Sequence, residues 1–298
     1  RIDDEWLYSA ETLALKLMSR LAHEKLRELF ELEYQTLASL AHPRTVAVYE
    51  LGSDARGDFY TMELLEGEDL SACAPVSWRA ACDYLRDASE ALGLLHARKL
   101  IHRDVSPKNL WRCRDGRVKL IDFGALAPFG RTSHVIGTPP FVPPEALELR
   151  GLDQHADLYA LGAVGYFLLT GRHAYPARTL QDLSALWTRP LVPPSIYAAQ
   201  LGRADLEPVP AELDTLVLAL LAQNEYARPG DTVEVIDRLD AIRGETRAID
   251  LESAEARLRN AAFVGRTREC RRFSRMLLLA QRGRGQVRSG APSSRLTT

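Results

Sequence analysis

The hydrophobic pattern of this chain of 298 residues changes its period near Gly67. Before that glycine, residues 6–18 and 46–62 alternate apolar and polar side chains, with a turn at residues 52–58, which predicts a small antiparallel sheet. Between these stretches, residues 23–40 predict a helix, because apolar side chains recur every three or four residues at Leu26, Leu29, Phe30, Tyr34, Leu37 and Leu40. After Gly67 the pattern predicts helices over residues 77–95, 158–169, 180–187, 213–222 and 233–242. The predicted fold class is therefore α+β, with a sheet part before a larger helical part.

The composition favours a folded protein of a reducing compartment. Apolar residues make up 46% of the chain and charged residues 26%, which is typical of globular domains and not of disordered chains. The four cysteines lie far apart without a C-x-x-C pair, which argues against a disulfide framework or a zinc site. The longest apolar run, residues 158–169, is too short to span a bilayer, and no signal-peptide pattern is evident. We therefore expect a cytoplasmic protein without a membrane span.

Two motifs in the helical part carry chemistry. His102-Arg103-Asp104-Val105-Ser106-Pro107-Lys108-Asn109 is followed, thirteen residues after its asparagine, by Asp122-Phe123-Gly124. Either tripeptide alone, H-R-D or D-F-G, occurs by chance in loops, but the two in this order and spacing are specific. Together they resemble the catalytic loop and metal-binding motif of protein kinases, in particular the bacterial, Hanks-type serine/threonine kinases. The resemblance covers about residues 5–243 and implies a two-lobed fold, with a small antiparallel sheet lobe and a mostly helical lobe.

Phosphoryl transfer explains these residue types. The reaction needs an acceptor for the proton of the substrate hydroxyl and oxygen ligands for Mg²⁺, which is a hard cation. The resemblance implies that Asp104 is the catalytic base and that Asn109 and Asp122 bind the metal. The implied cofactors are ATP and Mg²⁺.

Upstream residues resemble the part of a kinase that holds the nucleotide phosphates. Leu13-Ala14-Leu15-Lys16 is similar to the V-A-I-K segment, whose lysine contacts the α- and β-phosphates. Glu33, on the following helix and nine residues before His42-Pro43, has the position of the glutamate that pairs with that lysine. The alternative is a solvated surface lysine and glutamate that serve no site.

The segment that ends the sheet part is similar to a kinase hinge. Met62 has the gatekeeper position, and the resemblance implies that backbone groups of Glu63 and Leu65 bind adenine. It also implies that Asp69 reaches the ribose hydroxyls. Trp111 falls near the floor of the adenine pocket, where a smaller aliphatic residue is usual, so that either the nucleotide sits differently or the indole points away.

Downstream residues complete the resemblance. Residues 137–145, which end in Pro143-Pro144-Glu145, are similar to the peptide-binding segment that ends in A-P-E, and Thr138 is a substrate-pocket residue by this comparison. Arg228 lies where the buried partner of Glu145 belongs, and Asp157 matches the start of the central helix. These three charged residues are expected to be structural, since a buried charge needs a partner.

A regulatory site is implied between the two motifs. Thr132 and Ser133 lie between the D-F-G and P-P-E segments, and Arg103 is placed to bind a phosphate there through paired hydrogen bonds. The sequence thus predicts switching by phosphorylation. An ordinary polar loop remains the alternative for Thr132 and Ser133.

Besides Trp111, the chain departs from the kinase pattern in the catalytic loop and in the glycine-rich loop. Serine/threonine kinases usually carry lysine two residues after the catalytic aspartate, where this sequence has Ser106. Lys108, four residues after Asp104, is a catalytic candidate because its flexible stem can bring the same charge to the γ-phosphate. The glycine-rich loop over the phosphates is expected upstream of Arg1, outside this sequence.

The C-terminal part has a different charge. Residues 243–298 hold 13 arginines against five acidic residues, whereas the whole chain has a net charge of −2. Residues 263–269, F-V-G-R-T-R-E, are similar to the opening of signal-transduction ATPase domains, but no phosphate loop follows. Little aromatic interleaving argues against nucleic-acid binding by this tail. We expect an incomplete sheet lobe over 1–66, a helical lobe over 67–243, a linker over 244–262 and a basic tail over 263–298.

Three functions compete. The leading hypothesis is a protein kinase of bacterial signal transduction that phosphorylates serine or threonine of proteins, with self-phosphorylation compatible with it. A pseudokinase that acts as a binding module is the alternative, motivated by Ser106, by Trp111 and by a glycine-rich loop that this sequence does not contain. A small-molecule phosphotransferase would share the catalytic aspartates but lack the segment 137–145.

Overall fold

The computed structural model describes residues 12–19, 24–40, 42–202 and 207–244. The chain divides into two compact units, residues 1–257 and 258–298, and the second unit lies outside the described residues. The strand expected over residues 6–11, most of the expected linker and the whole basic tail therefore also lie outside them. The fold below is that of the first unit.

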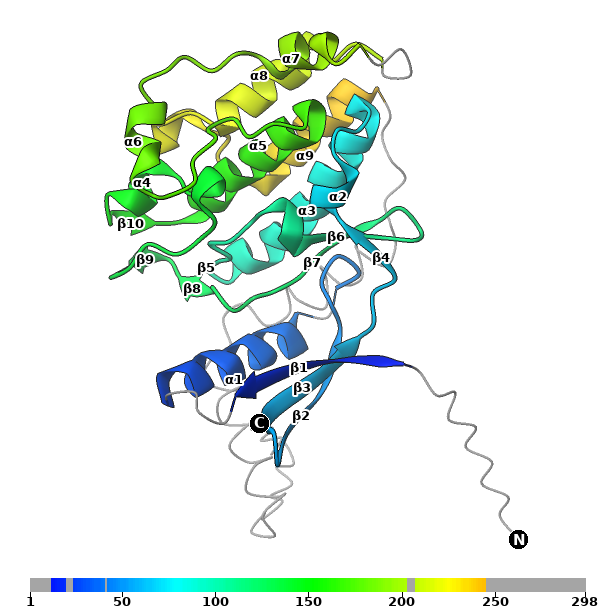
Figure 1. Ribbon diagram of the computed structural model, residues 1–298, viewed down its shortest axis with the longest axis vertical. Coiled ribbons are helices and arrows are strands. Elements are labelled where there is room, and N and C mark those ends of the chain that lie inside the picture. Colours follow the sequence, from blue (N-terminus) through cyan, green and yellow to red (C-terminus); the bar gives the residue numbers. More distant parts are fainter. Residues whose placement is uncertain (1–11, 20–23, 41, 203–206, 245–298) are drawn as a thin grey trace, which may run out of the picture. The chain divides into compact units, whose positions relative to one another are not determined.

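The first part is a three-stranded antiparallel sheet with one helix (Figure 1). Its elements are β1 (Leu13–Ser19), α1 (Glu24–Ser39), β2 (Val48–Asp54) and β3 (Gly57–Glu63), and the strand order is β1-β3-β2. The pairing of β1 with β3 places Lys16 directly opposite Tyr60, so both side chains lie on one face of the sheet. The rings of Phe30 and Tyr34 on α1 lie 5.0 and 5.8 Å from the ring of Tyr60. This face of the sheet therefore meets α1.

The structure corrects two details of the sequence reading here. The hairpin turn is only Ala55–Arg56, not residues 52–58, because the Asp54 carboxylate accepts the Arg56 backbone N–H at 2.7 Å and closes a short turn. Gly52 lies within β2, where a Cβ would come 2.7 Å from the Phe59 ring that covers it. On α1, the expected apolar face is buried only in its second half, and Leu26 is 52% exposed.

The second part is mostly helical. A small sheet of β4 (Gly67–Asp69), β6 (Leu110–Cys113) and β7 (Val118–Leu120) lies beside the lobe junction, and short pairs join β5 (Leu100–Ile101) to β8 (Ala127–Pro128) and β9 (Gly130–Arg131) to β10 (Gly151–Leu152). The helices are α2 (Leu70–Cys73), α3 (Trp78–Ala97), α4 (Pro144–Leu147), α5 (Gln154–Thr170), α6 (Asp182–Leu186), α7 (Pro194–Gln200), α8 (Ala211–Leu220) and α9 (Thr232–Arg243). Single 3₁₀ turns are η1 (Pro107–Asn109), η2 (Pro139–Phe141) and η3 (Glu225–Ala227). The predicted α+β class is confirmed.

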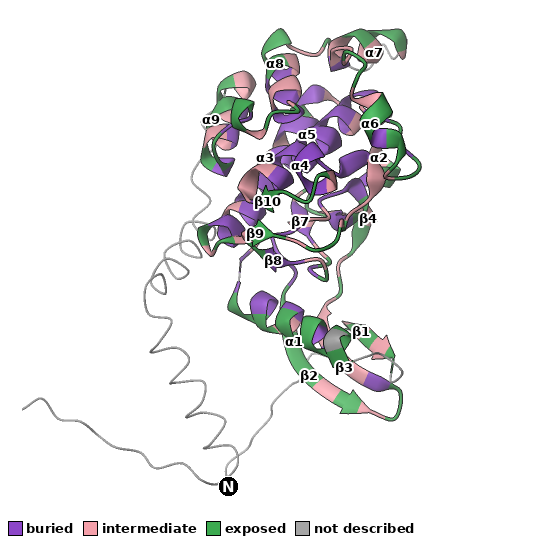
Figure 2. Cartoon of the chain, turned by 90° about the vertical axis from the view of Figure 1, so that its left-hand side faces the viewer, coloured by how far each residue is buried: buried purple, intermediate pink, exposed green. Residues whose placement is uncertain are grey.

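Helix α5 is the centre of the helical part (Figure 2). It begins earlier than its apolar run predicts, because Asp153 caps it by accepting the His155 backbone N–H at 3.0 Å, and it ends at Gly171, whose φ is +68°. The neighbours approach it closely, since a Cβ at Gly162 would lie 2.5 Å from Leu220 of α8 and one at Gly165 would lie 3.0 Å from Leu85 of α3. Close packing on both sides fixes the loops that follow α5 and precede it.

None of the helices in the described ranges combines the length and the apolar character needed to cross a membrane.

Candidate active site

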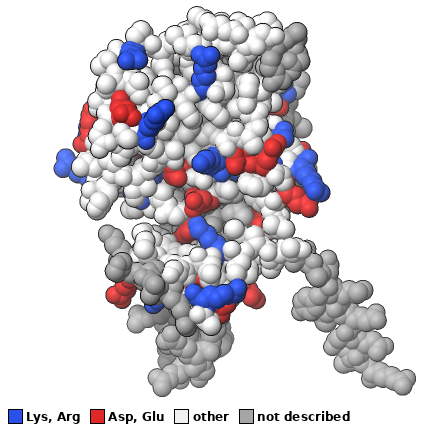
Figure 3. Space-filling view, viewed as in Figure 1, with Lys and Arg blue, Asp and Glu red and all other residues white. Residues whose placement is uncertain are grey.

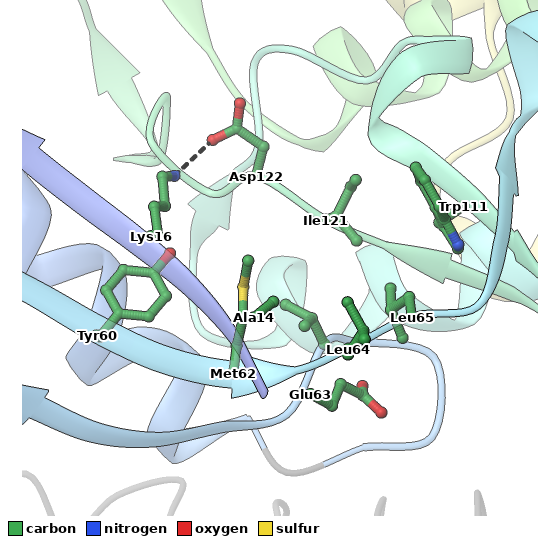
Figure 4. A pocket seen from close by; sticks show the side chains of 11 residues that line it. Ala14, Lys16, Tyr60, Met62, Glu63, Leu64, Leu65, Trp111, Ile121 and Asp122 are labelled. Atoms are coloured by element: carbon green, nitrogen blue, oxygen red, sulfur yellow. Dashed lines mark hydrogen bonds and ion pairs between the residues drawn. The ribbon is translucent and has the colours of Figure 1, made fainter. Parts of the chain in front are cut away.

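A cavity of about 280 Å³ lies where the sheet part meets the helical part (Figure 4). Its walls come from strands β1 and β3, the segments before β2 and after β3, strand β6 and the residues after β7. The lining residues are Ala14, Lys16, Val46, Tyr60, Met62, Glu63, Leu64, Leu65, Trp111, Ile121 and Asp122. Lys16 and Asp122 lie at one end of the cavity, and Trp111 and Leu65 lie at the other. The structure thus gathers Ala14, Lys16, Met62, Glu63, Leu65 and Trp111, all expected at the nucleotide, around one space.

An ion-pair network closes the polar end of this cavity. The Lys16 Nζ lies 2.6 Å from Glu33 Oε1 and 2.9 Å from Asp122 Oδ1. Burial alone would lower the pKa of Lys16, but the charge of Glu33 and hydrogen bonds to both carboxylates outweigh burial and raise it. Burial would likewise raise the pKa of Asp122, but the hydrogen bond from Lys16 lowers it. Lys16 is therefore a firmly protonated cation and Asp122 a firmly ionised carboxylate.

Glu33 is the buried anchor of this network. It is 3% exposed, and its Oε1 also accepts hydrogen bonds from the Tyr60 hydroxyl at 3.1 Å and the Phe123 backbone N–H at 3.0 Å. Sequence reasoning missed Tyr60, although strand register could have found it, because Tyr60 is the cross-strand partner of Lys16. The three donors fix both Lys16 and the start of the Asp122-Phe123-Gly124 segment.

The catalytic-loop motif forms a second hydrogen-bonded cluster. Asn109 Nδ2 donates to the Asp104 backbone carbonyl at 2.8 Å and to Asp104 Oδ2 at 3.0 Å. Asp104 Oδ1 accepts from both the backbone N–H and the hydroxyl of Thr138, each at 3.0 Å. Thr138 therefore joins the expected peptide-binding segment directly to the expected catalytic carboxylate.

The backbone of that loop is held from below by Asp157 on α5. Asp157 is fully buried and accepts the backbone N–H groups of His102 and Arg103, each at 2.9 Å, while His96 Nε2 lies 2.9 Å from the same carboxylate. Arg103 has a φ of +68°, a conformation that costs free energy for a residue with a side chain. Asp157 stabilises this strained turn, which turns the Asp104 side chain towards Thr138.

The Arg103 side chain binds the backbone of the next segment. Its guanidinium donates to the carbonyl of Ala125 and, at 3.3 Å, to the carbonyl of Leu126. Thr132 is half-buried, and the exposed Ser133 pairs its hydroxyl with His134 Nδ1 at 2.6 Å. A role for Thr132 and Ser133 as phosphate acceptors near Arg103 stays a prediction.

Two residues expected at the nucleotide have other contacts. Asp69 does not line the cavity, and its Oδ1 accepts the Ser71 backbone N–H at 2.8 Å as the cap of α2. The Glu63 carboxylate binds Lys119 Nζ at 2.5 Å and the Ala47 backbone N–H at 2.8 Å, which leaves only its backbone for the cavity. The ribose contact of Asp69 stays a prediction.

Ser106 and Trp111, which depart from the kinase pattern, lie in the catalytic loop and at the cavity. Ser106 is 2% exposed and precedes the 3₁₀ turn η1, whereas Lys108 within that turn is exposed. Lys108 is thus the exposed cation on the loop that carries Asp104. Trp111 lines the cavity, so its side chain does not point away from it.

Glu145 and Arg228 form a buried ion pair. Arg228 Nη1 and Nη2 lie 2.6 and 2.8 Å from the two carboxylate oxygens of Glu145, and both side chains are almost fully buried. Arg228 also donates to the backbone carbonyls of Ala222 and His155, each at 2.8 Å. The pair holds the end of the segment 137–145 against the start of α5.

A cavity with a lysine–glutamate pair at one end, in a fold that also holds a hydrogen-bonded aspartate on a loop, is typical of a phosphotransferase of the protein kinase type. Comparison with known proteins agrees with this geometry. The chain belongs to the protein kinase family, since the model of the protein kinase domain matches residues 8–238. The predicted two-lobed kinase fold is confirmed.

Bacterial serine/threonine kinases are among the relatives of this chain. The chain is 34% identical over 246 residues to the serine/threonine-protein kinase PknL of Mycobacterium tuberculosis, which covers 78% of this chain and 59% of PknL. It is 34% identical over 230 residues to PknB of Mycolicibacterium smegmatis, covering 72% of this chain and 35% of PknB. It is also 32% identical over 234 residues to the DNA damage-responsive serine/threonine-protein kinase RqkA of Deinococcus radiodurans, covering 73% and 33%. The chain thus spans from a third to about three fifths of the length of these relatives.

Proposed function

We propose that this chain transfers the γ-phosphoryl group of ATP to serine or threonine hydroxyls of proteins in bacterial signal transduction, its own Thr132 and Ser133 among them. The observation that carries the proposal is the pairing of Lys16 with buried Glu33 in a cavity that also holds Asp122. A surface lysine and glutamate would not need a 3% exposed carboxylate with three donors. The family and the names of the relatives support the same reaction.

The residues divide the work between nucleotide and acceptor. Lys16, held by Glu33, is the cation for the α- and β-phosphates, and the apolar end of the cavity near Leu65 and Trp111 takes the adenine. The Asp122 carboxylate and the Asn109 amide are hard oxygen donors that fit Mg²⁺, which usually takes one or two such protein ligands together with phosphates. When bound, Mg²⁺ neutralises phosphate charge as the phosphoryl group moves.

Asp104 prepares the acceptor. Its carboxylate is fixed by Asn109 at one oxygen and by Thr138 at the other. A hydroxyl bound beside it gives its proton to Asp104 while its oxygen forms the new bond to phosphorus and the bond from phosphorus to ADP breaks. Lys108 is the cation proposed to approach the γ-phosphate where Ser106 leaves none.

The geometry gives less support to a pseudokinase. That hypothesis rests on Ser106, Trp111 and the glycine-rich loop, and of these neither Ser106 nor Trp111 disturbs the hydrogen bonds of Asp104 or Lys16. A small-molecule phosphotransferase is disfavoured because Thr138 of the segment 137–145 binds Asp104 directly. In our proposal the sheet lobe spans 1–66 and the helical lobe 67–243, and a linker and a basic tail follow them. We propose that the protein acts in a reducing cytoplasm.

Labelled ATP tests the proposal. The chain, incubated with Mg²⁺ and dephosphorylated casein, should put label on serine or threonine of casein and of itself. Asp104→Asn should lower the rate by about 10²- to 10⁴-fold, because the proton acceptor is lost. Asp115→Asn, a matched change at an exposed aspartate in the turn after β6, should leave the rate within about twofold.

Two results would contradict the proposal. Equal labelling by the parent and Asp104→Asn would mean that Asp104 is not the catalytic carboxylate. Binding of Mg-ATP without transfer to any protein would favour a binding module. To test Lys108, Lys108→Met should lower kcat while Lys99→Met, an exposed lysine away from the loop, should not.

A further inference from the structure

Most arginines of the described ranges donate to a carboxylate or a carbonyl. On the face of the molecule in Figure 3, basic and acidic side chains lie next to one another across the middle. Within the described part of the chain, the arginines whose side chains have neither an ion pair nor a hydrogen bond are Arg131, Arg172, Arg178 and Arg189. Two of them, Arg172 and Arg189, line the same cavity. This cavity therefore brings together two guanidinium groups that have no ion pair.

That cavity has a volume of about 480 Å³ and lies in the helical part, between the end of α5, the segment after it and the segment after α6. No acidic side chain is among the residues that line it. Its walls are aromatic and aliphatic, and the Tyr166 hydroxyl closes one side by donating to the Val192 carbonyl at 2.9 Å. The Arg172 guanidinium lies 4.9 Å from the centre of the Tyr197 ring, which orients it without neutralising it. An anionic ligand is therefore complementary to this space.

Packing connects the cavity to the candidate active site. His173 lines the cavity, and its ring lies edge-on against the ring of Phe141, with centres 5.4 Å apart. Phe141 ends the 3₁₀ turn η2, three residues after Thr138, whose hydroxyl binds Asp104 at 3.0 Å. The segment 138–141, which binds Asp104 through Thr138, therefore packs through the buried Phe141 ring against the wall of this cavity.

We propose that this cavity is a subsite for acidic side chains of the protein substrate, a few residues away from the phosphorylated hydroxyl. The inference rests on the proposed kinase function and adds a substrate class to it. Guanidinium groups bind carboxylates through paired, charge-assisted hydrogen bonds. Arg172 and Arg189 can each bind a carboxylate in this way. A free small anion would explain the charge as well, but not the connection through His173 and Phe141 to Asp104.

The expected effect is one on binding. Both guanidiniums are exposed, so each pair with a carboxylate is worth only about a two- to fivefold change in affinity. The contact is remote from the reacting atoms and equal in ground and transition state, so it should appear in KM and not in kcat. It should also weaken with salt, because exposed charges are screened.

Synthetic peptides test the subsite. A serine peptide is made with a run of glutamates after the serine, with the same run before it, and with glutamines in both places. One of the glutamate peptides should show a KM about five- to tenfold below that of the glutamine peptide. Two variants, the single Arg189→Gln and the double Arg172→Gln/Arg189→Gln, should remove that advantage. In both, the KM of the glutamine peptide should stay unchanged. Arg178→Gln is the matched control, because Arg178 is on the same surface segment but does not line the cavity.

A binding experiment separates this inference from the proposed function. Fluorescent glutamate and glutamine peptides are titrated into the Asp104→Asn variant, with and without Arg189→Gln, and their anisotropy is followed. The subsite is supported if the Asp104→Asn variant prefers the glutamate peptide and the added Arg189→Gln change abolishes this preference. This result would hold even if the chain proves to be inactive. The inference is overturned if the acidic and neutral peptides bind alike, or if Arg178→Gln weakens binding as much as Arg189→Gln. Inhibition by inorganic phosphate equal to that by the glutamate peptide would assign the cavity to small anions instead.

Discussion

The buried pair of Glu145 and Arg228 gives the sharpest stability prediction. Arg228 has no exposed side-chain surface and Glu145 has 2%, and they share two hydrogen bonds of 2.6 and 2.8 Å. Arg228→Met keeps the length of the side chain but removes the charge and five donors. It leaves the Glu145 carboxylate buried without its cation, and it also removes the guanidinium donor from the Ala222 carbonyl, which follows α8, and from the His155 carbonyl in the first turn of α5. Glu145→Leu leaves a buried guanidinium that still has those two carbonyls.

These contacts set the magnitudes. Breaking a buried ion pair by removing one partner costs about 3–5 kcal/mol of unfolding free energy. Arg228→Met should lie at the upper end, because the partly buried Ala222 carbonyl also loses the guanidinium donor, and the loss of a hydrogen bond to a buried acceptor costs about 1–3 kcal/mol. Glu145→Leu should cost less, about 3 kcal/mol. The double variant should be at least about 2 kcal/mol more stable than the sum of the single changes, since neither charge then remains buried alone.

Urea unfolding followed by tryptophan fluorescence measures these differences as shifts in the midpoint at constant slope. The pair Arg238 and Glu234 on α9 is a matched control, because its atoms lie 2.5 Å apart but both side chains are more than 40% exposed. Its coupling energy should be below about 0.5 kcal/mol. Additive effects of Arg228→Met and Glu145→Leu would refute the reasoning, as would equal coupling energies for the buried and the exposed pair.

Three further predictions concern the cavity and its support. Glu33→Gln should raise the KM for ATP by about tenfold in a transfer assay, because Lys16 loses its buried ionic partner and keeps an ion pair only with Asp122. An unchanged KM would contradict the role of the pair. ATP should quench tryptophan fluorescence, and Trp111→Leu should abolish the quenching, because Trp111 lines the adenine end of the cavity. Burial lowers the pKa of His102 below its ordinary 6.5, so the unfolded chain takes up the proton first and stability is lost as the pH falls below that value, by up to about 1.4 kcal/mol per pH unit. His102→Gln should flatten this dependence in urea titrations between about pH 5 and 7, and an equally steep slope would assign it to another group.

The sequence predicted the main elements of the fold because their periodicity is strong. The helices expected at 77–95 and 233–242 lie within one or two residues of α3 and α9, whose caps Ser77 and Asp231 are readable in the sequence. Helix α5 was expected too short, since an apolar run marks burial on all sides and not helix length. The polar first turn of α5 holds Asp157, whose burial only the tertiary structure reveals.

The spacing of the motifs predicted which residues belong to the candidate site, but it did not predict their individual contacts. Lys16, Asp104 and Asp122 come from different parts of the chain, and their motifs carry the tertiary information that local propensity lacks. Asp69 has a contact that the motif does not describe, because a carboxylate beside the start of a helix accepts the nearest backbone N–H, here that of Ser71. Arg172 and Arg189 belong to irregular segments without periodicity, so no sequence pattern could place them on one cavity.

The hydrogen bonds that shape the catalytic-loop motif do not depend on the side chain at position 106. The shape of the catalytic loop is fixed by backbone contacts, since Asp157 accepts the N–H groups of His102 and Arg103 and Asn109 donates to the carbonyl of Asp104. None of these bonds involves the side chain of residue 106. In the proposed mechanism, a change there alters the charge near the bound phosphates and leaves the hydrogen bonds of Asp104 in place. Positioning and charge stabilisation then come from different residues of the same loop, so we expect the loss of one cation to lower the rate of transfer without a change in the geometry of Asp104.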